Sequence, residues 1–245
     1  MPISGSDIVQ YLSTSAGSTG GAITGSSTTS GVKNNVWSDI TDASRIAGGT
    51  TYKKTFWKNN NGSFAASVPV IFTPILPTNM TLTIGLGVDS SDDADSGQGN
   101  MSAWSANALV SVVSDTAGDT RVVTIYGMNN AGTPVPTTET VVLSGTTQVL
   151  SANTYSKVWA VWVASVDAGK IVTVKQGSGG TVRGTIGLSK KICWLWVTAS
   201  SKGAGIALPN LASSQSYGVW RKLSWTAGAG AVKPNSLTLR FEENA

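Results

Sequence analysis

The chain has 245 residues and a net charge of +4, with 40% hydrophobic and only 12% charged residues. This length suits one large or two smaller β domains, and nine tryptophans at such low charge argue against a disordered chain. The absence of histidine excludes imidazole-based catalysis and histidine metal sites, while a single cysteine, Cys193 in an apolar run, excludes an internal disulfide.

The N-terminal region has neither the basic start nor the long apolar run of an export signal, and no segment reaches transmembrane length. We therefore expect a soluble protein without a membrane partner, assembled in the cytoplasm. Residues 13–31 are rich in Ser, Thr and Gly and predict a flexible arm, which is either disordered or ordered against a neighbouring subunit. Short helices are predicted near residues 4–12 and 38–46.

Strand-like runs follow at intervals of roughly 8–12 residues, separated by Gly, Asn and Asp turns, and this spacing is typical of antiparallel β-sandwiches. Residues 138–150, TETVVLSGTTQVL, read as a hairpin that turns at Ser144–Gly145. Residues 157–166, KVWAVWVASV, are apolar on both alternating faces and predict a strand covered on both sides. The other predicted strands are 51–58, 64–72, 80–88, 109–114, 121–128, 170–177, 181–188, 192–200, 217–225 and 236–241.

Two parts of the chain resemble the ends of a group of virion proteins from tailed bacteriophages. The first is YLSTSAGSTGGAITGSS, followed by VWSDITDASRIAGG and GGTTYKKTFWKNNNG. The second is the C-terminal pattern carried by residues 218–222, GVWRK, and 237–240, LTLR. In between, residues 121–174 include PVPTTETVVLSGTTQV and resemble a separate β module of phage structural proteins.

The resemblance implies an all-β fold of two antiparallel β-sandwich domains, Ig-like or jelly-roll-like, with the second inserted into the first. An N-terminal segment and flexible arm would cover residues 1–31. The outer domain would comprise residues 32–107 plus 188–245, and the inserted domain residues 108–187. Insertion of this kind is tolerated at exposed loop tips.

The function that the resemblance implies is that of a non-enzymatic structural protein of the virion without a cofactor. Among virion roles we favour a capsid decoration or cement protein on the capsid exterior, bound across major capsid protein subunits and to other copies of itself, for example as a trimer. A tail, baseplate or fibre component is the alternative within the same class. A carbohydrate- or receptor-binding module is an alternative from another class.

An acidic loop at residues 89–97 provides the only candidate for a metal site, because its carboxylates could gather a hard cation such as calcium. The candidate ligands are Asp92, Asp93 and Asp95. Their spacing does not match an EF-hand, so we favour a solvated acidic loop.

Aromatic and basic residues suggest further surfaces. Trp159, Trp162, Trp194 and Trp196 could form a sugar platform, but their apolar neighbours favour core packing. A DNA contact through Lys53, Lys54, Lys58, Lys190 and Lys191 is not expected, since no nucleic-acid motif accompanies them. Tryptophan and arginine are typical anchors of protein interfaces. The interface residues predicted on this basis are Trp220, Arg221, Lys222 and Trp225.

Overall fold

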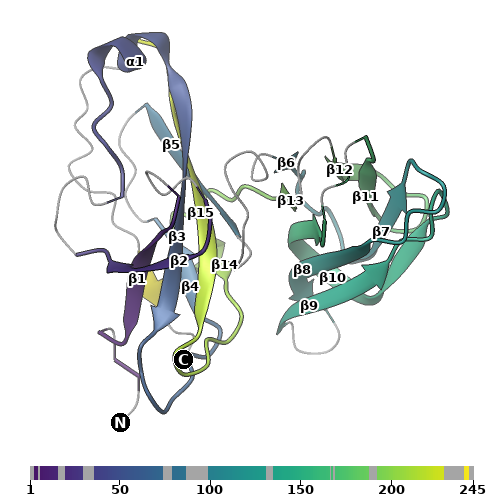
Figure 1. Ribbon diagram of the computed structural model, residues 1–245, viewed down its shortest axis with the longest axis horizontal. Helices are drawn as coiled ribbons and strands as arrows, with labels where there is room; N and C mark the ends of the chain where they lie inside the picture. Colours follow the sequence, from purple (N-terminus) through teal and green to yellow (C-terminus); the bar gives the residue numbers. More distant parts are fainter. Residues whose placement is uncertain are drawn as a thin grey trace. The chain divides into compact units, whose positions relative to one another are not determined.

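The computed structural model describes residues 3–4, 6–15, 20–29, 36–73, 79–86, 99–130, 135–165, 167, 169–187, 192–228 and 240–242. The chain forms two compact units (Figure 1). The first unit comprises Met1–Ala94 and Val197–Ala245, and the second comprises Asp95–Trp196. Strands dominate both units, which confirms the all-β prediction.

The first unit contains a five-stranded antiparallel sheet in the order β2-β1-β3-β15-β5 and a three-stranded sheet in the order β14-β4-β16. Central strands β3 and β15 pair over ten residues, from Ser216 opposite Lys58 to Trp225 opposite Gly49. The strands are β1 (Ile8–Ser13), β2 (Ile23–Ser27), β3 (Gly49–Asn59), β4 (Val70–Phe72), β5 (Met80–Leu86), β14 (Ile206–Ala207), β15 (Ser216–Trp225) and β16 (Arg240–Glu242).

The N-terminal predictions are partly wrong. Residues 8–12 form β1 instead of a helix, because they pair with residues 55–59 of β3. The predicted flexible arm is also wrong for residues 20–28. Here β2 pairs with β1, and the backbone N–H of Thr14 donates to the carbonyl of Ala22 at 2.9 Å. The segment that contains β2 is thus ordered by backbone hydrogen bonds to the edge of β1, although its small polar side chains bury little surface.

The second short helix is confirmed in part as α1 (Asp42–Ala47). Thr41 caps its N-terminus, since the Thr41 side chain accepts a hydrogen bond from the backbone of Ser44. Gly48 ends the helix at a φ of 73°, a conformation that favours glycine. The only other helical segment described is the 3₁₀ turn Lys202–Ala204.

The second unit is organised around β10, the longest strand. The beginning of β10 pairs with β7, and its remainder pairs with β8 on one side and β13 on the other. The pairing is antiparallel except between β6 and β13. The strands are β6 (Gly99–Asn100), β7 (Ala108–Ser114), β8 (Val122–Asn129), β9 (Val135–Val142), β10 (Val149–Val163), β11 (Val172–Gln176), β12 (Val182–Ile186) and β13 (Ile192–Trp194).

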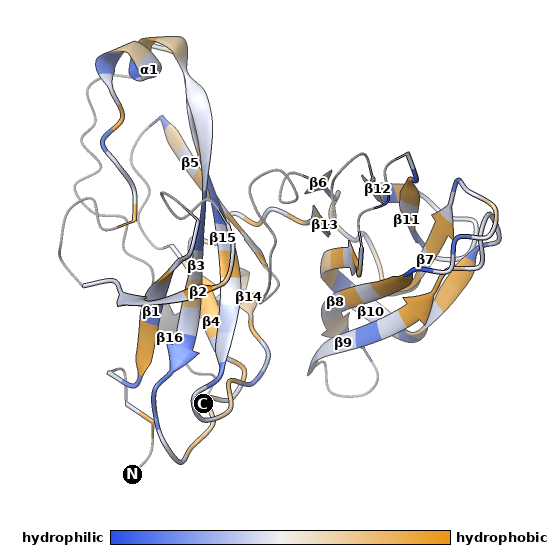
Figure 2. Ribbon diagram, in the orientation of Figure 1, coloured by the Kyte–Doolittle hydropathy of each residue, from blue (hydrophilic) through white to orange (hydrophobic). Residues whose placement is uncertain are grey.

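The hydrophobic core of the second unit lies on the inward faces of these strands, which Figure 2 shows as orange stretches along β7, β8, β10 and β11. Strand β10 is buried on both faces over Val158–Val161, which confirms the prediction for the middle of residues 157–166. Lys157, Ala164 and Ser165 are exposed, and residue 166 lies outside the described residues. The core residues include Val110, Val112, Val123, Ile125, Val141, Leu143, Tyr155, Val158, Val161, Val163, Val172, Val174 and Ile186.

The predicted hairpin at residues 138–150 is half right. Its turn is confirmed, with Ser144 bridged to Thr147 and Gly145 at a φ of 56°. Its pairing is wrong, because β9 pairs with β8 along its whole length. The turn binds the neighbouring loop instead: the backbone N–H of Gly145 donates to the carbonyl of Asp119 at 2.9 Å. This contact holds the turn while the two strands diverge.

Candidate interaction surfaces

Two of the four predicted interface residues lie inside the first unit. Trp220 is fully buried on β15, opposite Lys54 of β3 and Gly85 of β5. Arg221 is also buried, and its Nη2 donates to Thr55 Oγ1 at 3.1 Å. Burial lowers the pKa of the Arg221 guanidinium to about 9. On this chain alone, neither side chain reaches the surface.

The other two predicted interface residues are half-buried. Trp225 has a local structural role, because its Nε1 donates to the carbonyl of Ser44 at 2.9 Å and so fastens α1 to the end of β15. Gly49 leaves room for the Trp225 ring, since a Cβ at that glycine would lie 2.6 Å from the ring. Lys222 and Trp225 are three residues apart on β15, so their side chains lie on opposite faces of the sheet and do not form one interface.

The predicted basic residues on β3 do not form one patch. Lys53 and Lys54 are neighbours on a strand, so they project from opposite faces of the sheet. Lys54 is fully buried: its Nζ donates to the carbonyl of Gly21 at 2.9 Å and lies 4.9 Å from the centroid of the Phe56 ring. Partial burial lowers the pKa of Lys53. Lys190 and Lys191 lie outside the described residues.

The acidic candidates Asp92, Asp93 and Asp95 also lie outside the described residues. Within the described ranges, no three histidine, cysteine, aspartate or glutamate side chains come together in a way that could hold a metal ion. The predicted cation site therefore stays a prediction.

The tryptophans of the second unit differ in burial. Trp159 is buried and its ring centroid lies 5.2 Å from that of Tyr126. Trp162 and Trp196 are half-buried, and the side chain of Trp194 lies outside the described part of the chain. The predicted core packing is therefore confirmed for Trp159.

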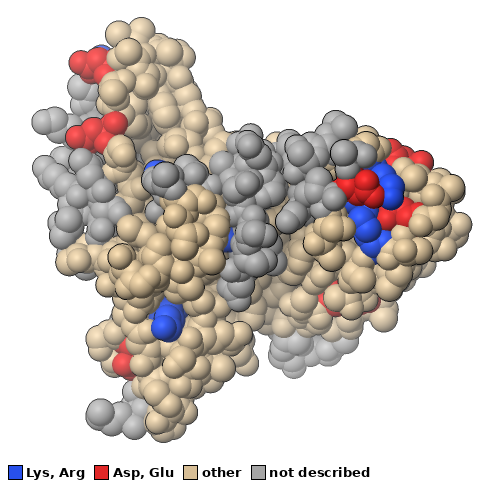
Figure 3. All heavy atoms as spheres, viewed as in Figure 1, with Lys and Arg blue, Asp and Glu red and all other residues tan. Residues whose placement is uncertain are grey.

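An exposed, uncharged surface lies on β8 and β9. Val122 and Val142 are direct cross-strand partners with 38% and 56% of their surface exposed. Thr138 and Thr140 are exposed and follow on the same face of β9, because alternate residues of a strand share a face. We call these four residues the β8–β9 strip. On the visible face in Figure 3, acidic and basic side chains gather at the right-hand end of the second unit and are sparse over the rest of the described surface.

Sequence reasoning missed this strip, because it assigned residues 138–150 a purely structural hairpin. A signal was present, however. In a strand, every second residue faces the same side, and one such side of this segment carries Thr138 and Thr140. The next residue on that side is Val142, where a third polar residue would be expected. A single exposed apolar residue is ordinary, but Val142 lies directly opposite exposed Val122 in the structure, and adjoining exposed apolar residues are more informative than isolated ones.

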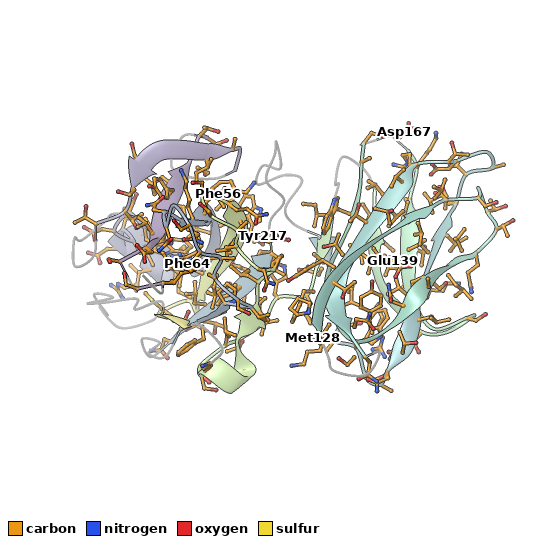
Figure 4. The ribbon with its side chains drawn as sticks, turned by 90° about the horizontal axis from the view of Figure 1, so that it is seen from below. Phe56, Phe64, Met128, Glu139, Asp167 and Tyr217 are labelled. Atoms are coloured by element: carbon orange, nitrogen blue, oxygen red, sulfur yellow. The ribbon has the colours of Figure 1, made fainter. Side chains whose placement is uncertain are left out.

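Glu139 holds β9 in place from the opposite face of the strand (Figure 4). Its carboxylate accepts hydrogen bonds from the backbone N–H groups of Ala152 and Asn153, from Asn153 Nδ2 at 2.9 Å and from the Tyr155 hydroxyl at 3.0 Å. Burial, together with the Glu139 charge, raises the pKa of Tyr155. Four donors on one carboxylate fix the strand that carries the β8–β9 strip.

A buried carboxylate, Asp119, fastens the loop to which the turn binds. Asp119 forms an ion pair with Arg121 at 2.8 Å and accepts a hydrogen bond from Ser114 Oγ at 2.7 Å. The hydrogen bonds from the Arg121 side chain hold the pKa of Asp119 well below its usual range, against the opposing effect of burial. The loop is therefore tied by charged hydrogen bonds, and the turn is tied to the loop by the backbone bond from Gly145 to the Asp119 carbonyl.

Comparisons with protein-family models, with curated proteins and with solved structures found no match for the chain. Within its described residues, no helix combines the length and apolar character that a membrane crossing requires. The structure thus defines the class of the protein, a two-unit all-β chain with open antiparallel sheets.

Proposed function

We propose that this chain is a non-enzymatic structural protein of a bacteriophage particle, with capsid decoration as its specific role. The observation that carries the proposal is the β8–β9 strip, an uncharged surface on a strand that Glu139 ties to β10 by hydrogen bonds. Exposed apolar residues that adjoin on a sheet are typical of surfaces that bind other proteins. The sequence resemblance to phage virion proteins supports the same role.

We further propose that each unit is a sandwich-like domain and that the second is a module inserted into the first. The division of the chain supports this arrangement, because the first unit is built from two stretches that flank the second. Strand β15, which follows the second unit in sequence, pairs with β3 and β5, which precede it. Ig-like or jelly-roll-like connectivity is part of the same proposal.

In this role the protein would bind across major capsid protein subunits and to other copies of itself on the capsid exterior. Each contact would bury surface that is exposed in the unbound proteins. Because the protein would bind the assembled shell and not its separate subunits, this binding would stabilise the shell by mass action. An exchange of the N-terminal segment between copies would first have to break the hydrogen bond from Lys54 to Gly21.

Quantitative mass spectrometry of purified particles tests the proposal by measuring the ratio of this chain to the major capsid protein. A ratio near one, or a simple fraction of one, supports decoration of the capsid lattice. A ratio of a few per cent would move the protein to the tail, baseplate or fibre. Absence from the particles would overturn the virion role and favour a separate binding module.

A further inference from the structure

The turn after β3 contains Asn61–Gly62, which is the only Asn–Gly pair in the sequence. Gly62 is exposed, and its backbone N–H donates no hydrogen bond within the described part of the chain. A Cβ built on Gly62 would meet nothing within 4 Å, and its φ is not positive. Gly62 is therefore an exposed residue with free space where a side chain would stand.

The side chain of Asn61, which precedes Gly62, is held by three hydrogen bonds. Its Oδ1 accepts hydrogen bonds from the backbone N–H groups of Ser63 and Phe64, both at 2.9 Å. Its Nδ2 donates to Asp7 Oδ2 at 3.2 Å. The two bonds to Oδ1 draw electron density from Cγ of the side-chain amide, which makes this carbon a better electrophile.

We propose that Asn61 is a site of spontaneous deamidation, in which the backbone nitrogen of Gly62 is the nucleophile. Solvent base removes the N–H proton, the nitrogen bonds to Cγ of Asn61, and the Cγ–Nδ2 bond breaks. The departing nitrogen takes up a proton and leaves as ammonia. Water then opens the five-membered imide at either carbonyl, which leaves aspartate or isoaspartate at position 61.

The product would disconnect the N-terminal segment from the turn. Asp7 is now stabilised as a carboxylate: hydrogen bonds from Ser4 and then from Asn61 hold its pKa below the usual value. A carboxylate at position 61 removes a donor to Asp7 and places a like charge beside it. The backbone bond from Asn60 to the Asp7 carbonyl, 2.7 Å long, lies next to this repulsion. Deamidation thus loosens the start of β1.

Peptide mapping of the intact folded chain during incubation in mildly alkaline buffer tests the chemical step, with the urea-unfolded chain as reference. We expect aspartate and isoaspartate to accumulate at Asn61 and not at Asn59 or Asn60. Gly62→Ala fits the structure and should slow the conversion by about tenfold, because a side chain restricts the backbone rotation that brings the nitrogen to Cγ. Conversion in the folded chain at less than about a tenth of the unfolded rate would overturn the proposal, since the native turn would then protect Asn61.

Hydrogen exchange of the Asn61→Asp variant tests the structural consequence independently. Residues 6–12 should exchange faster than in the unmodified chain, and the added change Asp7→Asn should restore slow exchange. Asn60→Asp is the matched control, because its side chain faces the Tyr11 hydroxyl instead of Asp7. Unchanged exchange in Asn61→Asp, or equal acceleration in Asn60→Asp, would refute the coupling to Asp7.

Discussion

Glu139 on β9 and Ala152 on β10 lie equally far in sequence from the turn at Ser144–Thr147, as paired residues of a hairpin would. They are joined through the Glu139 carboxylate, which accepts the backbone N–H of Ala152, and not through a backbone ladder. The side chain thus takes the place of a strand carbonyl where the strands separate. This lets β9 pair with β8 while β10 pairs with β7.

The first prediction concerns this carboxylate. Glu139→Gln keeps the size of the side chain but replaces one acceptor oxygen with a donor that faces backbone N–H groups. The free energy of unfolding should fall by about 2 kcal/mol, because the charged acceptor of hydrogen bonds from Ala152, Asn153 and Tyr155 is lost. Urea denaturation measures the change.

The matched control for Glu139→Gln is Asp167→Asn, which removes an acidic side chain that pairs with Lys170 at the surface. Exposed pairs of this kind contribute only about 0–1 kcal/mol. Equal losses in the two variants would show that the Glu139 network adds nothing beyond an ordinary surface ion pair.

The sequence predicted those parts of the fold that depend on local pattern. The alternation of Leu82, Ile84 and Leu86 with Thr and Gly predicted β5, and all three side chains are buried. The apolar run around Trp159 predicted a strand covered on both faces. Such features follow from the two-residue period of a strand and do not depend on its neighbours.

The features that were missed depend on partners distant in sequence. Residues 8–12 become a strand because β3 lies beside them, and no local signal reports that partner. Trp220 and Arg221 have the composition of an interface, yet β15 is the second strand from the edge and its pairing buries both. Glu139 was the one charged residue of its hairpin, but its bonds across to β10 could not be read from spacing.

The second prediction is a loss of stability in acid that depends on Asp119. Its folded pKa lies below the ordinary value of 3.8, so the folded state binds its proton less readily than the unfolded state. The ion pair with Arg121 therefore contributes fully above pH 3.8 and is lost as the pH falls below it.

Asp119→Asn should cost about 3 kcal/mol at neutral pH, since it leaves the Arg121 charge without its buried partner. The difference in unfolding free energy between this variant and the unmodified chain should then shrink as the pH is lowered towards 2. Chemical denaturation at several pH values measures it. A difference that stays constant with pH would contradict the assigned pKa direction.

The third prediction is that Tyr155 resists ionisation in the folded chain. Its pKa is raised, so the neutral phenol is favoured, and the stability it contributes is present below its ordinary pKa of 10.0 and lost as the pH rises above it. The ultraviolet difference titration between the unmodified chain and Tyr155→Phe should show no tyrosinate near pH 10 when folded. In the urea-unfolded chain, the Tyr155 signal should titrate with the ordinary pKa of tyrosine. An ordinary tyrosine titration in both the folded and the unfolded chain would refute the prediction.

The fourth prediction is that Lys54 fastens residues 20–28 to the sheet. Lys54→Met keeps the apolar stem and removes the hydrogen bond to the Gly21 carbonyl. Hydrogen exchange in residues 20–28 should accelerate by about tenfold, which corresponds to one lost hydrogen bond, while global stability changes little because a buried charge is also removed. Lys58→Met is the control, since Lys58 contacts the Tyr11 ring on β1 instead. No change on Lys54→Met would show that the β1–β2 pairing alone holds the segment.

The fifth prediction concerns the β8–β9 strip and rests on the proposed virion role. Val142→Lys introduces a charge at the most exposed valine of the strip, where any bound subunit would have to desolvate it. Binding to particles that lack this protein should weaken by at least about tenfold, because such a charge costs more than 1.4 kcal/mol at a buried contact.

Val182→Lys is the matched control, because Val182 is 51% exposed but lies on β12, away from the strip in strand order. If both variants bind as the unmodified chain does, the contact surface lies elsewhere. If both lose binding equally, added positive charge is the cause, since the chain already carries +4.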